Sequence, residues 1–186
     1  MGRLFISATR VVLLLCALAF AGTVLPALAQ PSPAATGTVR SKHGAWAVVC
    51  DQPAGAAGDQ CALLQTVVSA ERPDIGLAVI ALKTADGKAR ILRVLTPLGV
   101  ILPAQIGVYL DGVQVGSLEF KRCFEDGCYA EAILDKVETI NGQQMSLLDA
   151  LTKAKKVVFT VFDTLEVGIG FDIDMNGFPE GFAALP

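Results

Sequence analysis

The sequence predicts an all-β protein, an antiparallel β-sandwich with one short helix and two local disulfides. Three observations predict it: apolar and polar residues alternate along short segments, Asp-Gly pairs separate them, and four cysteines lie in two close pairs. Hydrophobic residues make up 53% of the 186 residues, and the formal net charge is −3. This composition is sufficient for a packed core, and it argues against intrinsic disorder and against nucleic-acid binding.

The N-terminus has the pattern of a secretory signal peptide. Arg3 and Arg10 precede an apolar run at 11–21, and Ala27-Leu28-Ala29 matches a cleavage site. We expect residues 1–29 to be removed, which places the protein in the periplasm or on the outer surface. An uncleaved anchor is the alternative.

The rest of the chain divides into an arm and one domain. Residues 30–42 are rich in Pro, Ala, Ser and Thr and are expected to be a disordered arm. Residues 43–186 are expected to form the β-sandwich domain, because no second linker of this composition follows. The apolar stretch at 91–110 contains prolines and an arginine, so we expect no transmembrane segment in the mature chain.

The expected strands are rich in Val, Leu and Ile or alternate at period two. They cover residues 46–50, 61–69, 76–83, 89–96, 128–134, 155–162 and 165–174. Trp46, Val48 and Cys50 share one parity, so the tryptophan and the first cysteine should enter the same core.

Turn residues join these strands. Asp111-Gly112 separates two short apolar segments, and this pair suits a type I′ hairpin turn because both positions need positive φ. Asp86-Gly87 and Asp126-Gly127 mark two further hairpins. Ser146 can cap a helix that starts at Leu147, and a short turn is expected over 179–185.

Cysteine usage is consistent with export. Cys50, Cys61, Cys123 and Cys128 allow three pairings. Local geometry favours Cys50–Cys61 and Cys123–Cys128, because the second pair flanks a tight loop and would lie face to face across an antiparallel pair. Redox catalysis and zinc binding are weaker alternatives, because Cys-x-x-Cys is absent and the only histidine, His43, lies beside the arm.

The order of several motifs resembles the invasion-associated locus B family of exported bacterial proteins. The matching pieces are Trp46-x3-Cys50, Cys61-x3-Gln65, the Thr-Pro-Leu-Gly-Val-x-Leu segment at 96–102, Cys123-x4-Cys128-x-Ala130 and Gly-Phe-Ala-Ala-Leu at 181–185. The resemblance implies an immunoglobulin-like β-sandwich, an exported location and the same two local disulfides. It implies no catalytic residues. The segment at 176–182 departs from the family's usual closing sequence, so the resemblance does not define the geometry of the last turn.

A calcium site is one candidate function. Asp172, Asp174 and Asn176-Gly177 match the first half of an EF-hand loop, in which alternate oxygens converge on a hard cation. Position twelve is Ala183 where that loop needs a glutamate, so we expect a solvated strand face. No metal or other cofactor is predicted.

Enzymatic activity is the second candidate. His43 would have to act as the base of a serine hydrolase, and no Gly-x-Ser-x-Gly motif is present. A carboxylate pair drawn from Glu131, Asp135, Glu166 and Asp172 could serve a hydrolase, although each reads more simply as a solvated residue.

We therefore expect a non-enzymatic binding protein of the cell envelope whose partner is a protein or glycan at the envelope or on a host surface. The hairpin tip at Phe124, Glu125 and Asp126 is the predicted contact, together with the loop from Asp51 to Gln60. A structural protein that supports envelope integrity is the main alternative.

Overall fold

The computed structural model describes residues 37–52, 56–140 and 142–186. The predicted signal peptide and residues 30–36 of the predicted arm lie outside these ranges, as do residues 53–55 of the Asp51–Gln60 loop. All described residues belong to one unit, Ala35–Pro186.

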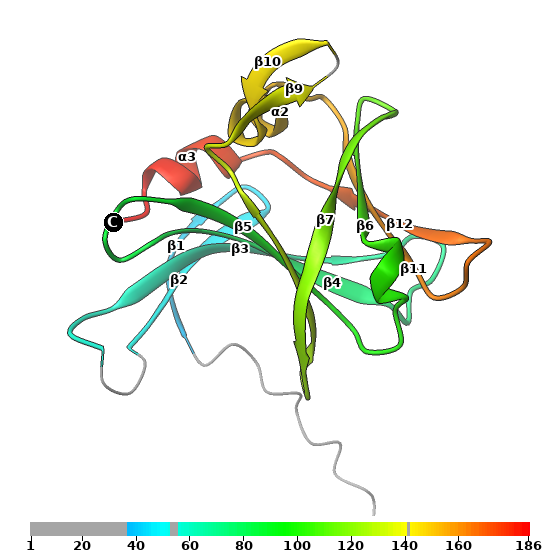
Figure 1. The fold of residues 1–186 in the computed structure, drawn as a ribbon. Helices are drawn as coiled ribbons and strands as arrows, with labels where there is room; N and C mark the ends of the chain where they lie inside the picture. Colours follow the sequence, from blue (N-terminus) through cyan, green and yellow to red (C-terminus); the bar gives the residue numbers. More distant parts are fainter. Residues whose placement is uncertain (1–36, 53–55, 141) are drawn as a thin grey trace, which may run out of the picture. The chain divides into compact units, whose positions relative to one another are not determined.

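The described residues form a ten-stranded antiparallel sheet in the order β1-β2-β3-β4-β5-β8-β7-β6-β11-β12 (Figure 1). Its strands are β1 (Thr38–His43), β2 (Trp46–Asp51), β3 (Gln60–Val68), β4 (Gly76–Lys83), β5 (Arg90–Thr96), β6 (Ile106–Leu110), β7 (Val113–Phe124), β8 (Gly127–Ile133), β11 (Val157–Phe162) and β12 (Gly168–Ile173). A separate hairpin pairs β9 (Val137–Ile140) with β10 (Gln143–Ser146). The predicted antiparallel all-β class with two local disulfides is confirmed.

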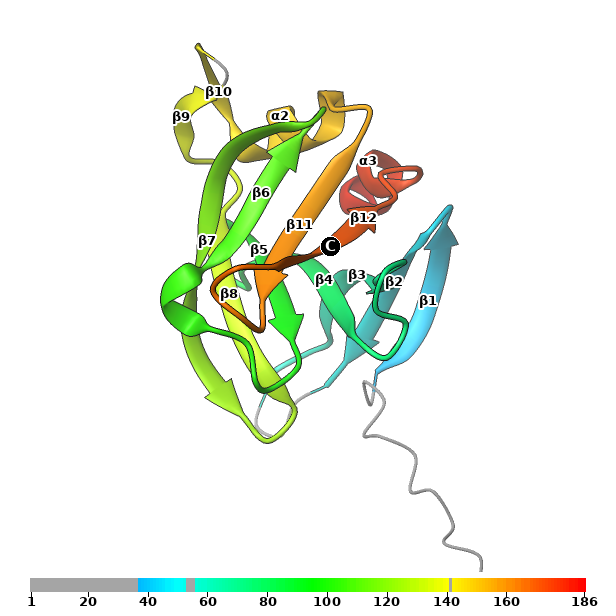
Figure 2. The ribbon, with the colours of Figure 1, turned by 90° about the vertical axis from the view of Figure 1, so that its right-hand side faces the viewer.

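The long strand β7 connects the two halves of the sheet. Its first half pairs with β6, from Val113 to Leu118, and its second half pairs with β8, from Glu119 to Phe124. Each pairing contains a register shift, and such bulges bend a strand and increase its twist. The sheet therefore turns at β7, and its halves face each other, as Figure 2 shows.

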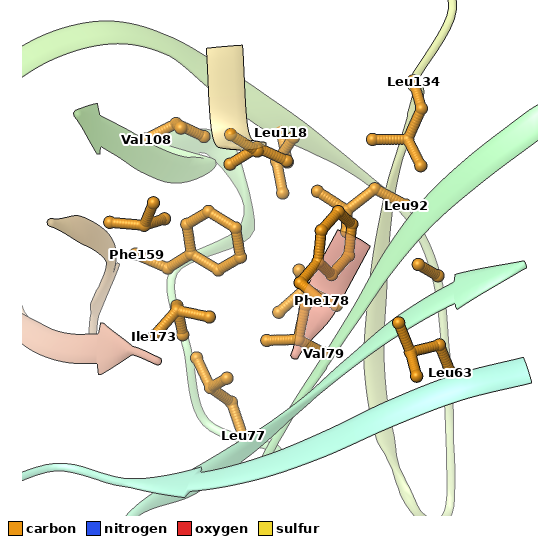
Figure 3. Close-up of a cluster of buried hydrophobic side chains, with 14 of the residues drawn as sticks. Leu63, Leu77, Val79, Leu92, Val108, Leu118, Leu134, Phe159, Ile173 and Phe178 are labelled. Atoms are coloured by element: carbon orange, nitrogen blue, oxygen red, sulfur yellow. The ribbon is translucent and has the colours of Figure 1, made fainter. Parts of the chain in front are cut away.

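One hydrophobic core lies between these halves. In Figure 3, Leu63 and Val79 lie on one side, Val108 and Leu118 on the other, and the rings of Phe159 and Phe178 between them. Trp46, Val48 and Cys50 are all buried, which confirms that the tryptophan and the first disulfide share this core.

The hairpin turn between β6 and β7 has the predicted geometry. Asp111 has φ of 50° and Gly112 has φ of 84°, so both central residues adopt the positive φ of a type I′ turn. The Asp111 carboxylate also accepts hydrogen bonds from the backbone N–H groups of Lys155 and Lys156, which fixes the turn against the start of β11.

One of the two α-helices in the described residues follows the sequence expectation. Helix α2 (Leu147–Lys153) begins after Ser146, whose hydroxyl accepts a hydrogen bond from the Asp149 N–H. Helix α3 (Phe178–Ala183) replaces the short turn expected near the C-terminus, and a 3-10 turn, η1, covers Leu102–Ala104. None of the helices in the described ranges has the length and apolar character needed to cross a bilayer.

The C-terminal segment closes the end of the core next to β1, β2 and β3. Gly44 and Gly177 both have positive φ, and their backbones meet so closely that a Cβ on Gly177 would lie 2.0 Å from the His43 carbonyl oxygen. The Ala45 N–H also donates to the Asn176 carbonyl at 3.2 Å. The first hairpin and the last turn therefore interlock through their backbones.

Two expectations about strands need correction. Residues 38–42, which we placed in a disordered arm, pair with β2 as part of β1. The strand expected over 165–174 begins only at Gly168, and Leu165 and Val167 are exposed in the preceding loop. Alternation alone did not distinguish this loop from a strand.

Candidate functional site

The predicted contact residues lie at the tip of the β7–β8 hairpin. Cys123 and Cys128 are opposite one another and form a disulfide, and Glu125 and Asp126 make the turn. Residue 127 has φ of 142°, and a Cβ at this position would lie 2.1 Å from the Thr96 carbonyl oxygen, so only glycine fits here. The tip is thus held against the end of β5 and closed by a covalent bond.

Phe124 is exposed at this tip, with 54% of its surface accessible to solvent. The edge of its ring meets Tyr129 at a centroid distance of 5.8 Å, and the Arg122 guanidinium lies 5.4 Å from the ring centre. These contacts hold the ring in place on the surface without burying it in the core.

The contacts continue along the outer surface of β8 and β5. Arg93 lies 5.7 Å from the Tyr129 ring, and its Nε donates to Glu131 at 2.7 Å. We call Arg93, Arg122, Phe124 and Tyr129 the aromatic–arginine cluster. Tyr and Arg are enriched among residues that dominate binding energy, and stacked guanidinium groups keep free N–H donors.

Asp126 connects the turn to this cluster. Its carboxylate accepts a hydrogen bond from the Tyr129 hydroxyl. Burial raises the pKa of Tyr129 above 10.0, and the bond to Asp126 raises it further. The phenol therefore stays neutral and keeps its proton for this bond at physiological pH.

Sequence reasoning found Phe124 and Asp126 but missed Arg93, Arg122 and Tyr129. These three residues come together through the pairing of Tyr129 with Arg122 in β7 and with Leu95 in β5. One indication of this cluster is present in the sequence: Tyr129 and Glu131 alternate with apolar residues and so lie on the same, polar face of β8. This pattern does not show which strands pair with β8.

The second predicted contact segment is the loop between β2 and β3. Cys50 and Cys61 are opposite one another and form the other disulfide, with Cα atoms 4.1 Å apart. Beside the loop, Asp59 forms an ion pair with Arg40 of β1 at 2.6 Å. Both disulfides favoured by the sequence are therefore present, and each closes a local hairpin.

A cleft of about 370 Å³ opens where β7 leaves β8, next to the β9–β10 hairpin. Its floor includes Leu118 and Ile140, and three glutamates line it: Glu119, Glu131 and Glu138. Each is paired with a cation, respectively Lys121, Arg93 and Lys136.

These carboxylates do not form an acid–base pair. Hydrolysis by two carboxylates needs one of them to stay protonated, with a raised pKa. The Lys121 ammonium instead lowers the pKa of Glu119. The other acids considered from the sequence are dispersed: Asp135 pairs with Arg90, Asp172 pairs with Lys156, and Glu166 lies in the β11–β12 loop.

His43 lies in β1, where its Nε2 is 2.9 Å from the Ser41 hydroxyl. A catalytic serine–histidine pair also needs a group that orients the imidazole through its other nitrogen. In the described part of the chain no carboxylate bonds to that nitrogen, so the contact is a part-buried hydrogen bond between two side chains on the same face of one strand.

In the segment from Asp172 to Gly177, which resembles half of a calcium-binding loop, the two carboxylates make contacts within the protein. Asp172 forms an ion pair with Lys156 at 3.2 Å, and the Asp174 carboxylate accepts the Asn176 N–H at 2.8 Å. Over residues 37–52, 56–140 and 142–186, no three His, Cys, Asp or Glu side chains are arranged to hold a metal ion.

Two residues of the sequence motifs converge on Asp174. The Trp46 Nε1 and Gln65 Nε2 each donate to its carbonyl oxygen at 2.7 Å, and Gln65 Oε1 accepts its N–H at 3.1 Å. The Gln65 amide thus pairs with both the backbone N–H and the backbone C=O of one residue just beyond β12, as a neighbouring strand would. These motif residues hold the two halves of the fold together.

The fold and its exposed hairpin define a small, disulfide-bonded antiparallel β-protein. The sequence profile of the invasion associated locus B (IalB) proteins matches residues 46–186. The chain belongs to the IalB family, which confirms the resemblance seen in its motifs.

The fold is also similar to a solved structure, invasion associated protein B from Bartonella henselae. The TM-score is 0.53, the sequences are 18% identical, and the match covers 76% of this chain and 91% of that chain. At this identity the similarity concerns the fold alone. A search of curated protein sequences finds no significant match.

Proposed function

We propose that this protein is exported to the cell envelope and binds a protein or glycan surface through the tip of the β7–β8 hairpin, without catalysis. The observation that carries the proposal is the aromatic–arginine cluster. A disulfide-closed hairpin presents Phe124, Tyr129 and two arginines in fixed positions, which lowers the entropy lost on binding.

Disulfide chemistry and family membership support the proposed location and partner. Two disulfides persist in oxidising compartments such as the periplasm or the cell exterior. The family's description and that of the Bartonella protein both refer to invasion, which favours a partner on a host surface. Planar aromatic rings and guanidinium groups suit both sugar faces and protein surfaces.

The test is Phe124→Ala, with Val137→Ala as the matched control. Val137 is 61% exposed, similar to Phe124, but lies on the β9–β10 hairpin. Removing an exposed ring should change the melting temperature by no more than about 2 °C, whereas loss of an aromatic anchor should weaken partner capture at least about tenfold. Chemical crosslinking in intact cells, followed by mass spectrometry, identifies the partner, and the same variants then measure binding.

Two outcomes would contradict the proposal. If Phe124→Ala destabilises the protein and leaves capture unchanged, the ring is structural. If deletion of the gene increases detergent sensitivity and leaves attachment to host cells unchanged, the protein instead supports the integrity of the envelope.

A further inference from the structure

Strands β2 to β5 are apolar on both of their faces. Their inward residues, such as Leu63, Val79 and Leu92, are fully buried in the core. The alternate residues, including Leu64, Ile80 and Leu82, are also apolar but are partly exposed and do not pack against that core. An antiparallel sheet with one solvated face normally has polar residues there.

The strand register arranges these side chains in rows, because directly opposed residues of antiparallel strands share a face. One row is apolar across six strands and consists of Val39, Val49, Ala62, Leu82, Ile91 and Ile133. The next row contains Ala47, Leu64 and Ile80, and a third contains Ala78 and Leu95. We call these eleven residues the outer apolar face.

In the described ranges, helices α2 and α3 leave the centre of this face open, and only its end at Ile91 and Ile133 borders the cleft beside the β9–β10 hairpin. Helix α3 packs on the inner side, where Phe178 meets Trp46 and Gly181 approaches Leu63. Figures 1 and 2 show both helices and strands β6, β11 and β12 on that same inner side.

Charge favours a second copy of this chain as the occupant. The three rows contain three charged residues from β1 to β8: Lys42, Arg93 and Glu131. The face therefore has no excess of negative charge, although the whole chain has a formal net charge of −3. In a two-fold dimer each copy presents the same patch, so the Arg93–Glu131 ion pair of one copy, closed at 2.7 Å, faces the same pair of the other copy, and each guanidinium can also meet the second carboxylate.

Regularity and size are consistent with this occupant. The pairings from β2 through β8 contain no register shift, so the side chains form even ridges, which suit packing of one sheet face on another. At about 4.8 Å between strands and about 7 Å between rows, the patch covers roughly 300–400 Å². This is the apolar centre of an interface whose polar rim brings it to about 800 Å² per partner.

We propose that the outer apolar face is a homodimer interface, formed by face-to-face packing of the β2–β5 and β8 region of two copies. This surface overlaps with the proposed binding site at Arg93, which lies in the second row, and at Tyr129, which is opposite Leu95 of the third row. Phe124 lies one row further on, so Phe124→Ala tests the hairpin tip without changing the dimer interface. The mature protein should change from monomer to dimer in sedimentation velocity between about 1 and 200 µM.

The first test places a charge on the face. Leu82→Lys should weaken dimerisation at least about tenfold, because an unpaired ammonium would be buried between the copies. Val113→Lys is the matched control: Val113 is 53% exposed on β7, off this face, and its change should leave the dimer constant unaltered. Thermal unfolding shows whether each variant is folded.

The second test uses charge pairing and does not depend on Leu82. Arg93→Glu makes the central pair acidic and Glu131→Arg makes it basic, so each variant alone should dimerise at least about tenfold more weakly than the parent protein. Their equimolar mixture should recover association as a heterodimer. A pair acting only within one copy cannot produce recovery on mixing.

Several outcomes would overturn the proposal. These are a monomer at 200 µM, a dimer insensitive to Leu82→Lys, or a mixture that associates no better than its separate components. Binding of neutral lipid vesicles by a monomer would assign the face to another occupant. Phe124→Ala should leave the dimer intact, so failure of either proposal can be recognised separately.

Discussion

At the scale of single residues, Gln65 is the polar group on which closure of the fold depends most. Its buried amide donates to the backbone carbonyl of Asp174 and accepts from the backbone N–H of the same residue, on a segment distant in sequence. A buried polar side chain is stabilising only when its donors and acceptors are paired, and here both are. The Gln65 side chain therefore has a structural role.

Gln65→Leu should lower the free energy of unfolding by about 2 kcal/mol, because the volume is nearly kept while both hydrogen bonds are lost. Urea denaturation followed by tryptophan fluorescence measures this change, since Trp46 is the only tryptophan. Gln144→Leu is the control: the side chain of this exposed glutamine donates to the nearby Thr139 hydroxyl, and its loss should cost no more than about 0.5 kcal/mol. Equal effects of the two changes would contradict the structural role of Gln65.

Glycine at 177 is required by contact as well as by conformation. Gly177→Ala should destabilise the fold by at least about 3 kcal/mol, because its Cβ would lie 2.0 Å from the His43 carbonyl oxygen. Gly87→Ala separates the two causes, because Gly87 has a similar φ of 69° but no atom within 4 Å of its Cβ position. It should cost only about 1 kcal/mol. If both variants unfold at the same urea concentration, backbone conformation alone determines the requirement.

At the scale of elements, the hairpins were the most predictable part of the sequence. The strand Gly76–Lys83 has the expected bounds, and the Asp111-Gly112 turn has the expected backbone, because side-chain alternation and turn chemistry are local signals. Strand β1 was missed because Thr38–His43 contains only one large apolar residue and is held by pairing with β2. The double pairing of β7 was missed because register between distant strands is set by tertiary contacts.

The candidate site likewise contains one residue that local sequence predicts and others that depend on tertiary contacts. Phe124 could be found from the turn between two cysteines, because an aromatic residue there has few neighbours along the chain. The outward rows that bring Arg93 beside Tyr129 depend on β5 pairing with β8, which is a contact between distant segments. Sequence alone gives the parity of each strand but not its neighbour.

The turn between β4 and β5 should respond to acid. The Thr84 hydroxyl and the Lys88 N–H both donate to the Asp86 carboxylate and hold its pKa below the ordinary 3.8. The ionised form therefore stabilises this hairpin above the unfolded-state pKa, and the stabilisation is lost as the pH falls through the lowered pKa. Carboxyl carbon NMR should show Asp86 titrating below 3.8, and Thr84→Val should raise that midpoint. A midpoint at or above 3.8 in the parent protein would contradict this account.

At the scale of the whole molecule, two disulfides and one shared core make a rigid frame for exposed loops. Each disulfide closes a hairpin on neighbouring strands, so neither connects the two halves of the sheet. The halves are joined by β7 and by the contacts of Trp46 and Gln65 with Asp174. Loss of the disulfides should therefore loosen the hairpins more than the arrangement of the core.

Intact-mass analysis of the protein purified from its own cells tests the state of the whole chain. We expect an N-terminus at Gln30 and a mass lowered by the hydrogens lost in forming two disulfides. Reduction followed by alkylation should then label four cysteines, and omission of the reductant should label none. Four thiols that react without reduction, or a retained N-terminal segment, would contradict export to an oxidising compartment.

The meeting of His43 and Gly44 with Asn176 and Gly177 has a consequence for the order in which the chain can fold. Any process that delivers the polypeptide from its first residue to its last, such as synthesis on a ribosome or threading through a translocation pore, releases the first hairpin long before its partner turn. Until then Trp46 and Gln65 have no Asp174 peptide to bond. Completion of the native state must therefore wait for the final segment, and the first hairpin remains without its closing contacts until then.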